Sequence, residues 1–372
     1  FFDYYLHTPG GAVSVSGGGF ESQIIQSLPI SFVDQQFIRG MISGIDAIIN
    51  LDFREAGDAS SADVDFFYDS EINLSGGDDT LGLAVSSGID WELFFDYPKI
   101  QNNENYRRYI LVHEFGHSLG LEHPFENRDG DVVGGITDPW QSSFPEETVM
   151  AYRNPLGDRW PEFFTDNDIN ALIETWGAEP RRLSTNDDSY DGFNYSEFVN
   201  GRQGNDRLRG FSGKDTLRGG AGEDWINGNQ NEDIVYGDSG SDWLLGGRDN
   251  DFVQGGDGDD WVNGNRGNDQ VFGGSGRDTL RGGQDDDWLD GGSGDDIYWG
   301  DKGADRFSIS SGFDIAADFN YGAGDRVAIR KGLAYSLQSD ESGLRVVTSV
   351  GTILLSNVDL NSINSGSLIV DY

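Results

Sequence analysis

Three of the four histidines in this 372-residue chain lie in the stretch HEFGHSLGLEHP, residues 113–124. His113 and His117 are four residues apart, so on a helix both imidazoles lie on one face, close enough to bind one metal ion. Gly120 can adopt the left-handed conformation that ends a helix and turns the chain back, which lets His123 supply a third nitrogen. Three neutral nitrogens with an open fourth position are typical of a catalytic zinc site rather than a structural one.

Glu114 follows His113 directly and is the candidate general base of this site. Bound zinc lowers the pKa of water toward about 7 and polarises a peptide carbonyl, so a neighbouring carboxylate can take the proton of the attacking water. A bare HExxH pattern occurs by chance, whereas the extended pattern HExxHxxGxxH is much more specific. We therefore expect one catalytic zinc ion.

The elements that position these residues are predicted from apolar spacing and capping residues. Residues 103–120 are expected to form the helix that carries the histidines, and residues 31–49 a second helix with Ser31 as its N-cap. Residues 165–177 are expected to form a third helix, with Thr165 as its N-cap and Gly177 at its end. DVDFFY and WELFF are expected to be strands, and GLAVSS (82–87) is the candidate edge strand that pairs with a substrate backbone.

A second pattern fills residues 201–308, which divide into twelve nonapeptides without an insertion. The first position is always Gly, the sixth is always Asp, and the eighth is always apolar or aromatic. Glycines that tolerate positive φ form a turn, and the apolar residue points inward from a short strand. A fixed period means that each unit stacks on its neighbours, with two units to a coil. A disordered acidic linker would need neither the period nor the apolar position.

The invariant Asp follows the turn, so stacking places the carboxylates in rows. Such rows repel unless a hard cation lies between them, and calcium accepts carboxylate and carbonyl oxygens in flexible geometry. One apolar residue per unit makes a core too thin to be stable through burial alone. Asn231, Asp249 and Asp285 replace Gly at the fourth position, which leaves the number of calcium ions open. We expect several structural calcium ions, held by Asp206, Asp215, Asp224, Asp233, Asp242, Asp251, Asp260, Asp269, Asp278, Asp287, Asp296 and Asp305.

The distribution of glycine and of apolar residues divides the chain into four parts. Residues 1–180 predict an α+β catalytic domain. Residues 181–200 are expected to be a linker with a degenerate first repeat, in which Glu197 replaces the Asp. The expected all-β parallel β-roll covers residues 201–308, and residues 309–372 predict a β-sandwich-like tail of strands.

Composition excludes several kinds of partner. The formal net charge is −40, so the phosphates of a nucleic acid would be repelled. The chain has no cysteine, so it forms no disulfide and no thiolate metal site. No run of about 18 apolar residues occurs, so no membrane span is expected. The absence of an initial Met suggests a processed mature form, and a lost pro-segment stays an open expectation.

The two patterns together resemble one protein family. HExxHxxGxxH marks the metzincin metalloproteases. Within them the chain resembles the serralysin family, in which a proline directly follows the third histidine, as Pro124 does here. Met150 in TVMAY matches the Met-turn of that family. Tyr152 matches the tyrosine that reaches the zinc as an extra ligand and assists in the transition state. Serralysins also carry a C-terminal array of these nonapeptides, the RTX repeats, so the resemblance covers nearly the whole chain.

The resemblance implies a function, a location and a set of partners. It implies a metzincin catalytic domain whose zinc is held by His113, His117, His123 and Tyr152, with Glu114 as base and Tyr152 assisting. It implies a secreted, extracellular bacterial endopeptidase that acts on proteins and peptides. Type I export through a signal in the tail is expected, as is a monomer, and a small protein inhibitor is a further candidate partner. The loop of residues 125–148 departs from the usual serralysin loop, so cleavage specificity is not inherited.

Two other interpretations were weighed. A calcium-dependent RTX adhesin or surface protein with an inactive peptidase domain would share the repeats, but such a protein could lose Glu114 at little cost to folding. A lipase with these repeats would use a GxSxG serine elbow, which the sequence does not contain. The intact zinc pattern therefore favours the peptidase.

Overall fold

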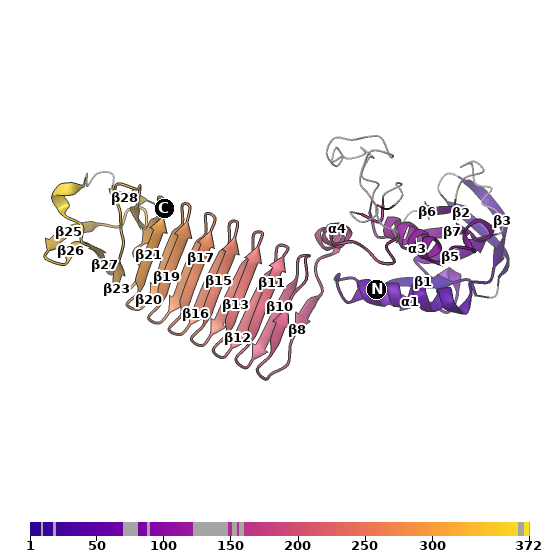
Figure 1. Cartoon of the computed structure of the whole chain (residues 1–372), viewed down its shortest axis with the longest axis horizontal. Coiled ribbons are helices and arrows are strands. Elements are labelled where there is room, and N and C mark those ends of the chain that lie inside the picture. Colours follow the sequence, from indigo (N-terminus) through magenta and orange to yellow (C-terminus); the bar gives the residue numbers. More distant parts are fainter. Residues whose placement is uncertain are drawn as a thin grey trace. The chain divides into compact units, whose positions relative to one another are not determined.

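The computed structural model describes residues 1–8, 10–17, 20–69, 81–87, 90–121, 148–150, 155, 160–363 and 368–371. The chain divides into two compact units, Phe1–Glu179 and Pro180–Tyr372 (Figure 1). Three residues of the predicted site, His123, Pro124 and Tyr152, lie outside the described residues, as do residues 125–147 of the loop between Pro124 and Met150.

The first unit is built on a seven-stranded mixed sheet. β5 lies at its centre and pairs in parallel with β1 on one side and with β7 on the other, and β4 pairs in parallel with β1. β6 pairs antiparallel with β7, and β3 pairs antiparallel with both β2 and β5. The strands are β1 (Phe2–Leu6), β2 (Gly11–Gly17), β3 (Phe20–Leu28), β4 (Phe53–Glu55), β5 (Val64–Asp69), β6 (Gly82–Ser87) and β7 (Asp90–Asp96).

Four α-helices are described in this unit, and each begins at a side-chain cap, two of which, Ser31 and Thr165, the sequence predicts. They are α1 (Phe32–Asp46), α2 (Tyr97–Ile100), α3 (Glu104–Ser118) and α4 (Asp166–Trp176). Ser31 caps α1, Asn103 caps α3, and Thr165 caps α4, each accepting a hydrogen bond from a backbone N–H in the first turn. The predicted helices and the strands DVDFFY and WELFF are therefore present.

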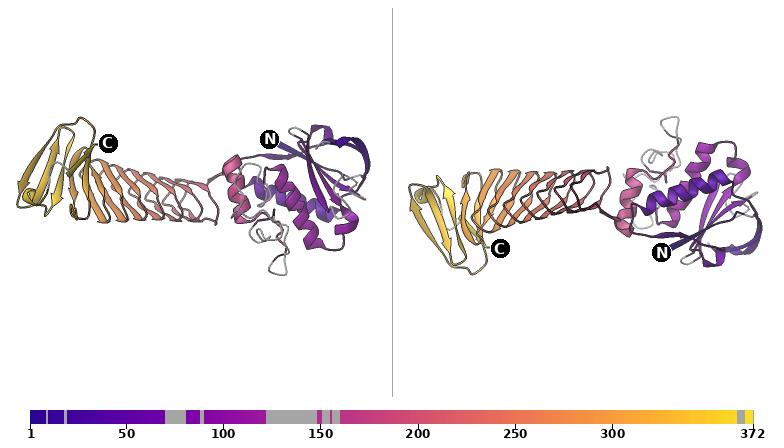
Figure 2. Two further views of the ribbon diagram at one scale, coloured as in Figure 1. Left: turned by 90° about the horizontal axis from the view of Figure 1, so that it is seen from above. Right: turned by 90° about the horizontal axis from the view of Figure 1, so that it is seen from below.

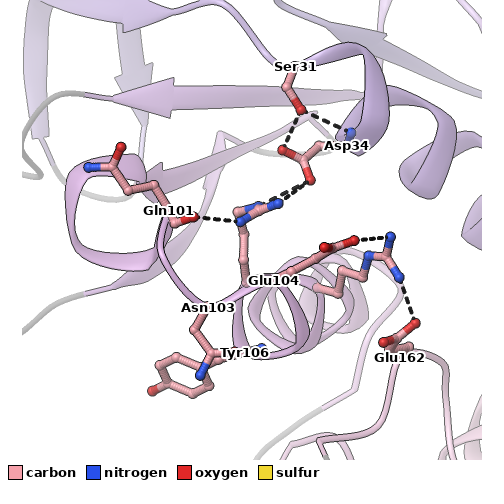
Figure 3. A network of polar contacts seen from close by, with 9 residues as sticks. Ser31, Asp34, Gln101, Asn103, Glu104, Tyr106 and Glu162 are labelled. Atoms are coloured by element: carbon pink, nitrogen blue, oxygen red, sulfur yellow. Dashed lines mark hydrogen bonds and ion pairs between the residues drawn. The ribbon is translucent and has the colours of Figure 1, made fainter.

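Helices α1 and α3 lie beside each other on one face of the sheet (Figure 2). A buried ion pair joins them: Nε and Nη2 of Arg107 in α3 lie 3.1 and 3.0 Å from Oδ1 of Asp34 in α1 (Figure 3). Ser31 donates to the other carboxylate oxygen of Asp34, and Arg107 also donates to the carbonyl of Gln101. Both charges are compensated inside the protein, and the pair fixes α3 against α1.

The second unit is a parallel β-roll whose strands alternate between a 10-stranded and an 11-stranded sheet (Figure 1). From β8 to β21 each strand pairs with the strand 18 residues later, so two nonapeptides form one coil as predicted. The strands are β8 (Pro180–Arg182), β9 (Ser189–Asp191), β10 (Phe198–Gln203), β11 (Arg207–Ser212), β12 (Thr216–Ala221), β13 (Trp225–Gln230), β14 (Ile234–Ser239), β15 (Trp243–Arg248), β16 (Phe252–Asp257), β17 (Trp261–Arg266), β18 (Gln270–Ser275), β19 (Thr279–Gln284), β20 (Trp288–Ser293), β21 (Ile297–Lys302), β22 (Arg306–Ser308), β23 (Gly312–Ala316), β24 (Arg326–Ile329), β25 (Tyr335–Asp340), β26 (Gly343–Thr348), β27 (Gly351–Ser356) and β28 (Ile369–Asp371).

The core of the roll is one side chain deep per strand. The eighth-position residues of all twelve nonapeptides have no exposed surface. They are Leu208, Leu217, Ile226, Val235, Leu244, Val253, Val262, Val271, Leu280, Leu289, Tyr298 and Phe307. The thin core predicted from the repeat is therefore present, and hydrophobic burial per coil is small.

The turns of the roll require backbone conformations that favour glycine. Gly240 has a φ of 132°, and a methyl group there would lie 1.7 Å from the carbonyl oxygen of Gly222 in the preceding coil. The fourth-position residues that replace Gly, namely Asn231, Asp249 and Asp285, keep left-handed φ values of 73°, 74° and 80°. Asn and Asp adopt this conformation more readily than other side chains. These replacements therefore preserve the turn.

The roll begins earlier than predicted. Residues 181–200 contain β8 and β9, which pair in parallel with β10 and β11. LSTNDDSYD (183–191) is an additional repeat with Asp188 at the sixth position, and it lacks the first-position Gly that defines the others. Its Asp188 N–H donates to Asp206, as in the later coils. The stretch expected as a linker is therefore part of the roll.

The roll also ends later than predicted. β23, β24, β27 and β28 join the two sheets in parallel, and only β25, β26 and β27 pair antiparallel with one another. ISSGFDIAA (309–317) is a further repeat with Gly312 and Asp314 at the fourth and sixth positions. Alternation of apolar and polar residues predicts a strand, but not whether it stacks on a roll or in a sandwich. The tail is continuous with the roll rather than a separate sandwich.

Because each coil has so little core, truncating one eighth-position side chain should be costly. We expect Leu244→Ala to lower the free energy of unfolding by about 2–5 kcal/mol. Gln230→Ala, at an exposed third position, should change it by no more than about 0.5 kcal/mol. Urea denaturation followed by circular dichroism in millimolar calcium measures both, and equal midpoints for the two variants would contradict the thin-core description.

Candidate metal centres

Helix α3 brings the first two predicted zinc ligands together. The rings of His113 and His117 have centroids 5.2 Å apart and are nearly perpendicular. His113 is buried and His117 is half-buried. Their spacing of four residues therefore places both imidazoles on one face of the helix, as predicted.

Backbone carbonyls fix the tautomer of both rings. Nδ1 of His113 lies 2.8 Å from the carbonyl oxygen of Val149, and Nδ1 of His117 lies 2.9 Å from that of Leu121. A carbonyl only accepts, so in each neutral ring Nδ1 carries the proton and donates it. The lone pair is then on Nε2, which is the form in which imidazole binds a metal. The two rings therefore fit the zinc that the sequence pattern implies.

Glu114 lies beside these ligands in a buried position. Burial raises the pKa of its carboxyl to about 8, although a hydrogen bond from the backbone N–H of Ala84 in β6 partly opposes this. A methyl group at Gly82 would lie 2.4 Å from Oε1 of Glu114, so only glycine allows β6 to approach this closely. A cation next to the carboxyl would favour its charged form.

β6 is the strand that the sequence suggested as an edge. It is antiparallel, and among the described strands it pairs only with β7. Ala84 and Gly82 lie next to Glu114, so this edge passes directly beside the candidate base. The placement of β6 agrees with the sequence prediction; pairing with a substrate stays a prediction.

Gly120 ends α3 as predicted. It has a φ of 99°, and its N–H donates to the carbonyl of His117, while the N–H of Leu121 donates to that of Gly116. This pair of bonds closes the helix with a left-handed residue. The turn directs the chain back so that Leu121 meets the ring of His117. His123 follows two residues later, outside the described residues.

The segment Thr148–Met150 lies directly against α3. Met150 is buried, and a methyl group at Gly116 would lie 3.0 Å from its sulfur atom. Glycine in the motif therefore allows the close approach of this segment. Within the described residues, the roll included, no group of three or more His, Cys, Asp or Glu side chains that could hold a metal ion is found. Only two of the predicted zinc ligands are among these residues. Tyr152 is outside that part of the chain, so its role stays a prediction.

The fourth histidine has a different environment. His7 stacks on Phe67 with ring centroids 3.9 Å apart and contacts Tyr5 edge-on. Burial lowers the pKa of His7 to about 4, so its ring is neutral near pH 7. It is therefore a packing residue.

The predicted calcium residues form two ladders along the roll. The N–H of each sixth-position residue donates to Oδ1 of the sixth-position Asp one coil later, for example Asp206 to Asp224 at 2.7 Å and Asp215 to Asp233 at 2.9 Å. All twelve predicted Asp residues are buried, with at most 3% of their surface exposed. The ladders therefore place the carboxylates in rows, as the stacking argument required.

The second oxygen of most ladder carboxylates is not satisfied by the protein. In eleven of the twelve predicted residues, all except Asp305, Oδ2 is buried without a hydrogen-bond partner in the described structure. Burying a carboxylate oxygen without a partner lowers the stability of the folded state, and a hard cation bound to that oxygen would compensate the loss. The chemistry of these oxygens therefore fits calcium.

Protein donors satisfy the ladders at their ends. Ser184 donates through both its N–H and its hydroxyl to Oδ2 of Asp188, and Phe193 and Tyr190 donate to the two oxygens of Glu197. At the other end, Ser310 donates to Oδ2 of Asp314 and Asn320 donates to that of Asp325. The repeat pattern did not reveal Asp188, Asp314 or Asp325; the spacing of 18 residues from Asp206 and Asp296 was the available signal for the first two.

Burial and neighbouring carboxylates make the ladder carboxyls hard to ionise without a cation. Burial, followed in each case by a partly opposing backbone hydrogen bond, raises the pKa of Asp251 and Asp287 to about 9. For Asp242 and Asp260 the pKa is raised to about 6 by the same cause. Nearby carboxylates add to the shift, such as Asp233 and Asp269 beside Asp251.

In calcium-free buffer, acidification should stabilise the roll. A carboxyl whose folded pKa is raised contributes most below its unfolded pKa of about 4, and this contribution is lost as pH rises through the folded values. Those values run from about 6 to about 9. We therefore expect more folded roll at pH 4.5 than at pH 8, measured at a fixed temperature as the β signal in circular dichroism.

The control is the same acidification in millimolar calcium. Protons and calcium compete for the same oxygens, so the stabilisation by calcium should shrink as pH falls. A calcium-free roll that is more stable at pH 8 than at pH 4.5 would contradict the assignment of the orphaned oxygens.

Comparison with known protein families identifies the nonapeptide repeats of the second unit. The RTX calcium-binding nonapeptide repeat family matches residues 191–226, 209–244, 236–271 and 272–307. Serralysin of Proteus mirabilis is 31% identical over 143 residues, which is 33% of this chain and 27% of that protein. Serralysin of Photorhabdus laumondii is 28% identical over 180 residues, which is 43% of this chain and 37% of that protein. The chain thus spans well under half of the length of these relatives.

A solved structure also matches. The extracellular lipase LipA of Serratia marcescens is 18% identical, with 52% of this chain and 40% of that chain covered, but the TM-score of 0.17 supports no inference.

No described helix is long and apolar enough to cross a membrane. Together the comparisons support a serralysin-like RTX protein whose repeats indicate structural calcium binding.

Proposed function

We propose that this chain is a secreted zinc-dependent endopeptidase stabilised by calcium in its roll. One observation carries the proposal: His113 and His117 are held by backbone carbonyls in the tautomer that binds metal, next to the buried carboxyl of Glu114. The similarity to serralysins supports the same activity, although it covers only part of their length.

The first unit would hold the zinc through His113 and His117, with His123 as the third ligand and Tyr152 as a further one. The two described rings fit this role because Nε2 carries the lone pair in each. The other two residues are inferred from the sequence: His123 from its spacing after Gly120, and Tyr152 from the resemblance to the family. When bound, zinc supplies a Lewis acid that acidifies water and polarises the scissile carbonyl.

Glu114 would move the proton. Its carboxylate takes a proton from the attacking water and then returns it to the amine that leaves. The N–H of Ala84 orients the carboxyl from β6. Strand β6 would therefore hold the carboxyl of Glu114 in place.

β6 would also bind the substrate. An edge strand presents backbone donors and acceptors that an extended peptide can pair with, which gives affinity without selecting side chains. Pairing beside Gly82 and Ala84 would place the peptide next to Glu114. Protein and peptide substrates of broad sequence are the class that this arrangement favours.

The roll fits a secreted protein. Without calcium its buried carboxylates oppose folding, and millimolar calcium outside the cell would fold it, since binding free energy becomes folding free energy. The RTX repeats and the serralysin relatives support this location. Type I export, a monomeric state and a protein inhibitor stay predictions from the resemblance.

The test of the proposed base is Glu114→Gln, which keeps the size of the side chain beside Gly82. We expect kcat for casein or a peptide substrate to fall roughly 10²- to 10⁴-fold, because no carboxylate remains to take the proton. Zinc content should stay at the wild-type value. Both are measured on full-length protein in calcium.

Glu104→Gln is the matched control, since Glu104 lies on the same helix with an exposed side chain. It should keep the wild-type kcat. If Glu114→Gln retains more than a tenth of the wild-type rate, or if the wild-type protein cleaves nothing while it holds zinc, the peptidase proposal is wrong and the binding-protein alternative gains support.

A further inference from the structure

A chain of hydrogen bonds connects α4 to the zinc-binding face of α3. Asp168 lies in the first turn of α4 and is 3% exposed. Its carboxylate accepts from the N–H of Val149 at 2.9 Å and from the hydroxyl of Thr148. The carbonyl of the same Val149 accepts from Nδ1 of His113 at 2.8 Å. One residue, Val149, therefore connects Asp168 to the ring of His113, through its N–H on one side and its carbonyl on the other.

Asp168 does more than helix capping requires. In the capping box of α4 it accepts from the N–H of Thr165 at 2.8 Å and from the Thr165 hydroxyl at 2.6 Å, both at Oδ2. A capping box uses one acceptor at this position. Asp168 also holds Val149 at Oδ2 and Thr148 at Oδ1, which lie 19 and 20 residues earlier. The second pair of bonds has no function in the helix itself.

The bonds of Thr148 close the arrangement. Its hydroxyl donates to Asp168 and accepts from the N–H of Met150 at 3.1 Å. The backbone from Thr148 to Met150 is thereby fixed at two N–H groups and one side chain. A carboxylate is needed for this, because every group that faces it is a donor.

We propose that Asp168 is a positioning residue of the metal site, which orients the Val149 carbonyl and through it the ring of His113. The inference rests on the proposed function, because it assigns a role toward the zinc of that site. A group that orients a metal-binding histidine usually changes metal affinity 10- to 100-fold when it is removed. Asp168 reaches the ring through the backbone of Val149, with no direct contact.

The test is the zinc dissociation constant of Asp168→Asn in the full-length, calcium-loaded protein, measured by competition with a chelator. The amide keeps one acceptor oxygen but turns the other into a donor, which then faces either the hydroxyl of Thr148 or the N–H groups of Val149 and Thr165. We expect zinc to bind roughly 10-fold or more weakly than in the wild type. The cobalt-substituted protein should show a changed visible absorption spectrum, since the geometry at His113 changes.

Trp176→Phe is the matched control for loosening of α4. Nε1 of Trp176 donates to the carbonyl of Leu119 at 2.9 Å, so this bond also ties α4 to α3 without touching Thr148–Met150. Its zinc affinity should stay within about threefold of the wild type even where its thermal midpoint falls. Equal zinc affinity in Asp168→Asn and the wild type, or an equal loss in Trp176→Phe, would overturn the inference.

Thr148→Val is the second variant, in case Asp168→Asn does not fold. It removes only the hydroxyl bonds and should weaken zinc binding while the capping box of α4 stays intact. Unchanged affinity in this variant also counts against the inference. If the wild type binds zinc through His113 and cleaves peptides while these variants keep full affinity, only this inference fails. If the wild type binds no zinc, the proposed function fails with it.

Discussion

The roll depends on carboxylates that the fold buries and only half satisfies. In each inner coil Oδ1 of the Asp accepts a backbone N–H, while Oδ2 is buried without a protein partner in the described structure. The core beneath is one side chain deep, so burial cannot outweigh this cost. Only where the ladders end do Ser184, Tyr190, Ser310 and Asn320 supply protein donors. Calcium would act between these ends, which makes the repeat a folding element that responds to its surroundings.

A related constraint organises the first unit. Glu114 is also a buried carboxylate with a raised pKa, but it lies beside two oriented imidazoles rather than in a row of like charges. Helix α3 is fixed from three sides: the Arg107–Asp34 ion pair joins it to α1, β6 approaches it through Gly82, and the Thr148–Met150 segment packs on Gly116. The three ties restrict the rings and the carboxyl to one arrangement. Such preorganisation is what a catalytic metal site requires.

Local patterns were predictable from the sequence, and long-range contacts were not. The helix of HEFGH, the left-handed Gly120 and the caps Ser31 and Thr165 follow from neighbours in the chain, and the structure contains them. The repeats at 183–191 and 309–317 were missed because they lack the first Gly, although their sixth residues continue the ladders. The bond of Ala84 to Glu114 and the second role of Asp168 join segments that only the folded chain brings together.

Hydrogen exchange at the backbone N–H groups of the ladder Asp residues tests the central claim most directly, because these groups donate the bonds that stack the coils. With millimolar calcium at neutral pH, the N–H groups from Asp206 to Asp287 should be strongly protected, and in calcium-free buffer they should exchange at the rates of an unfolded chain. Equal protection without calcium would show that the roll satisfies its buried carboxylates by itself and would contradict the account.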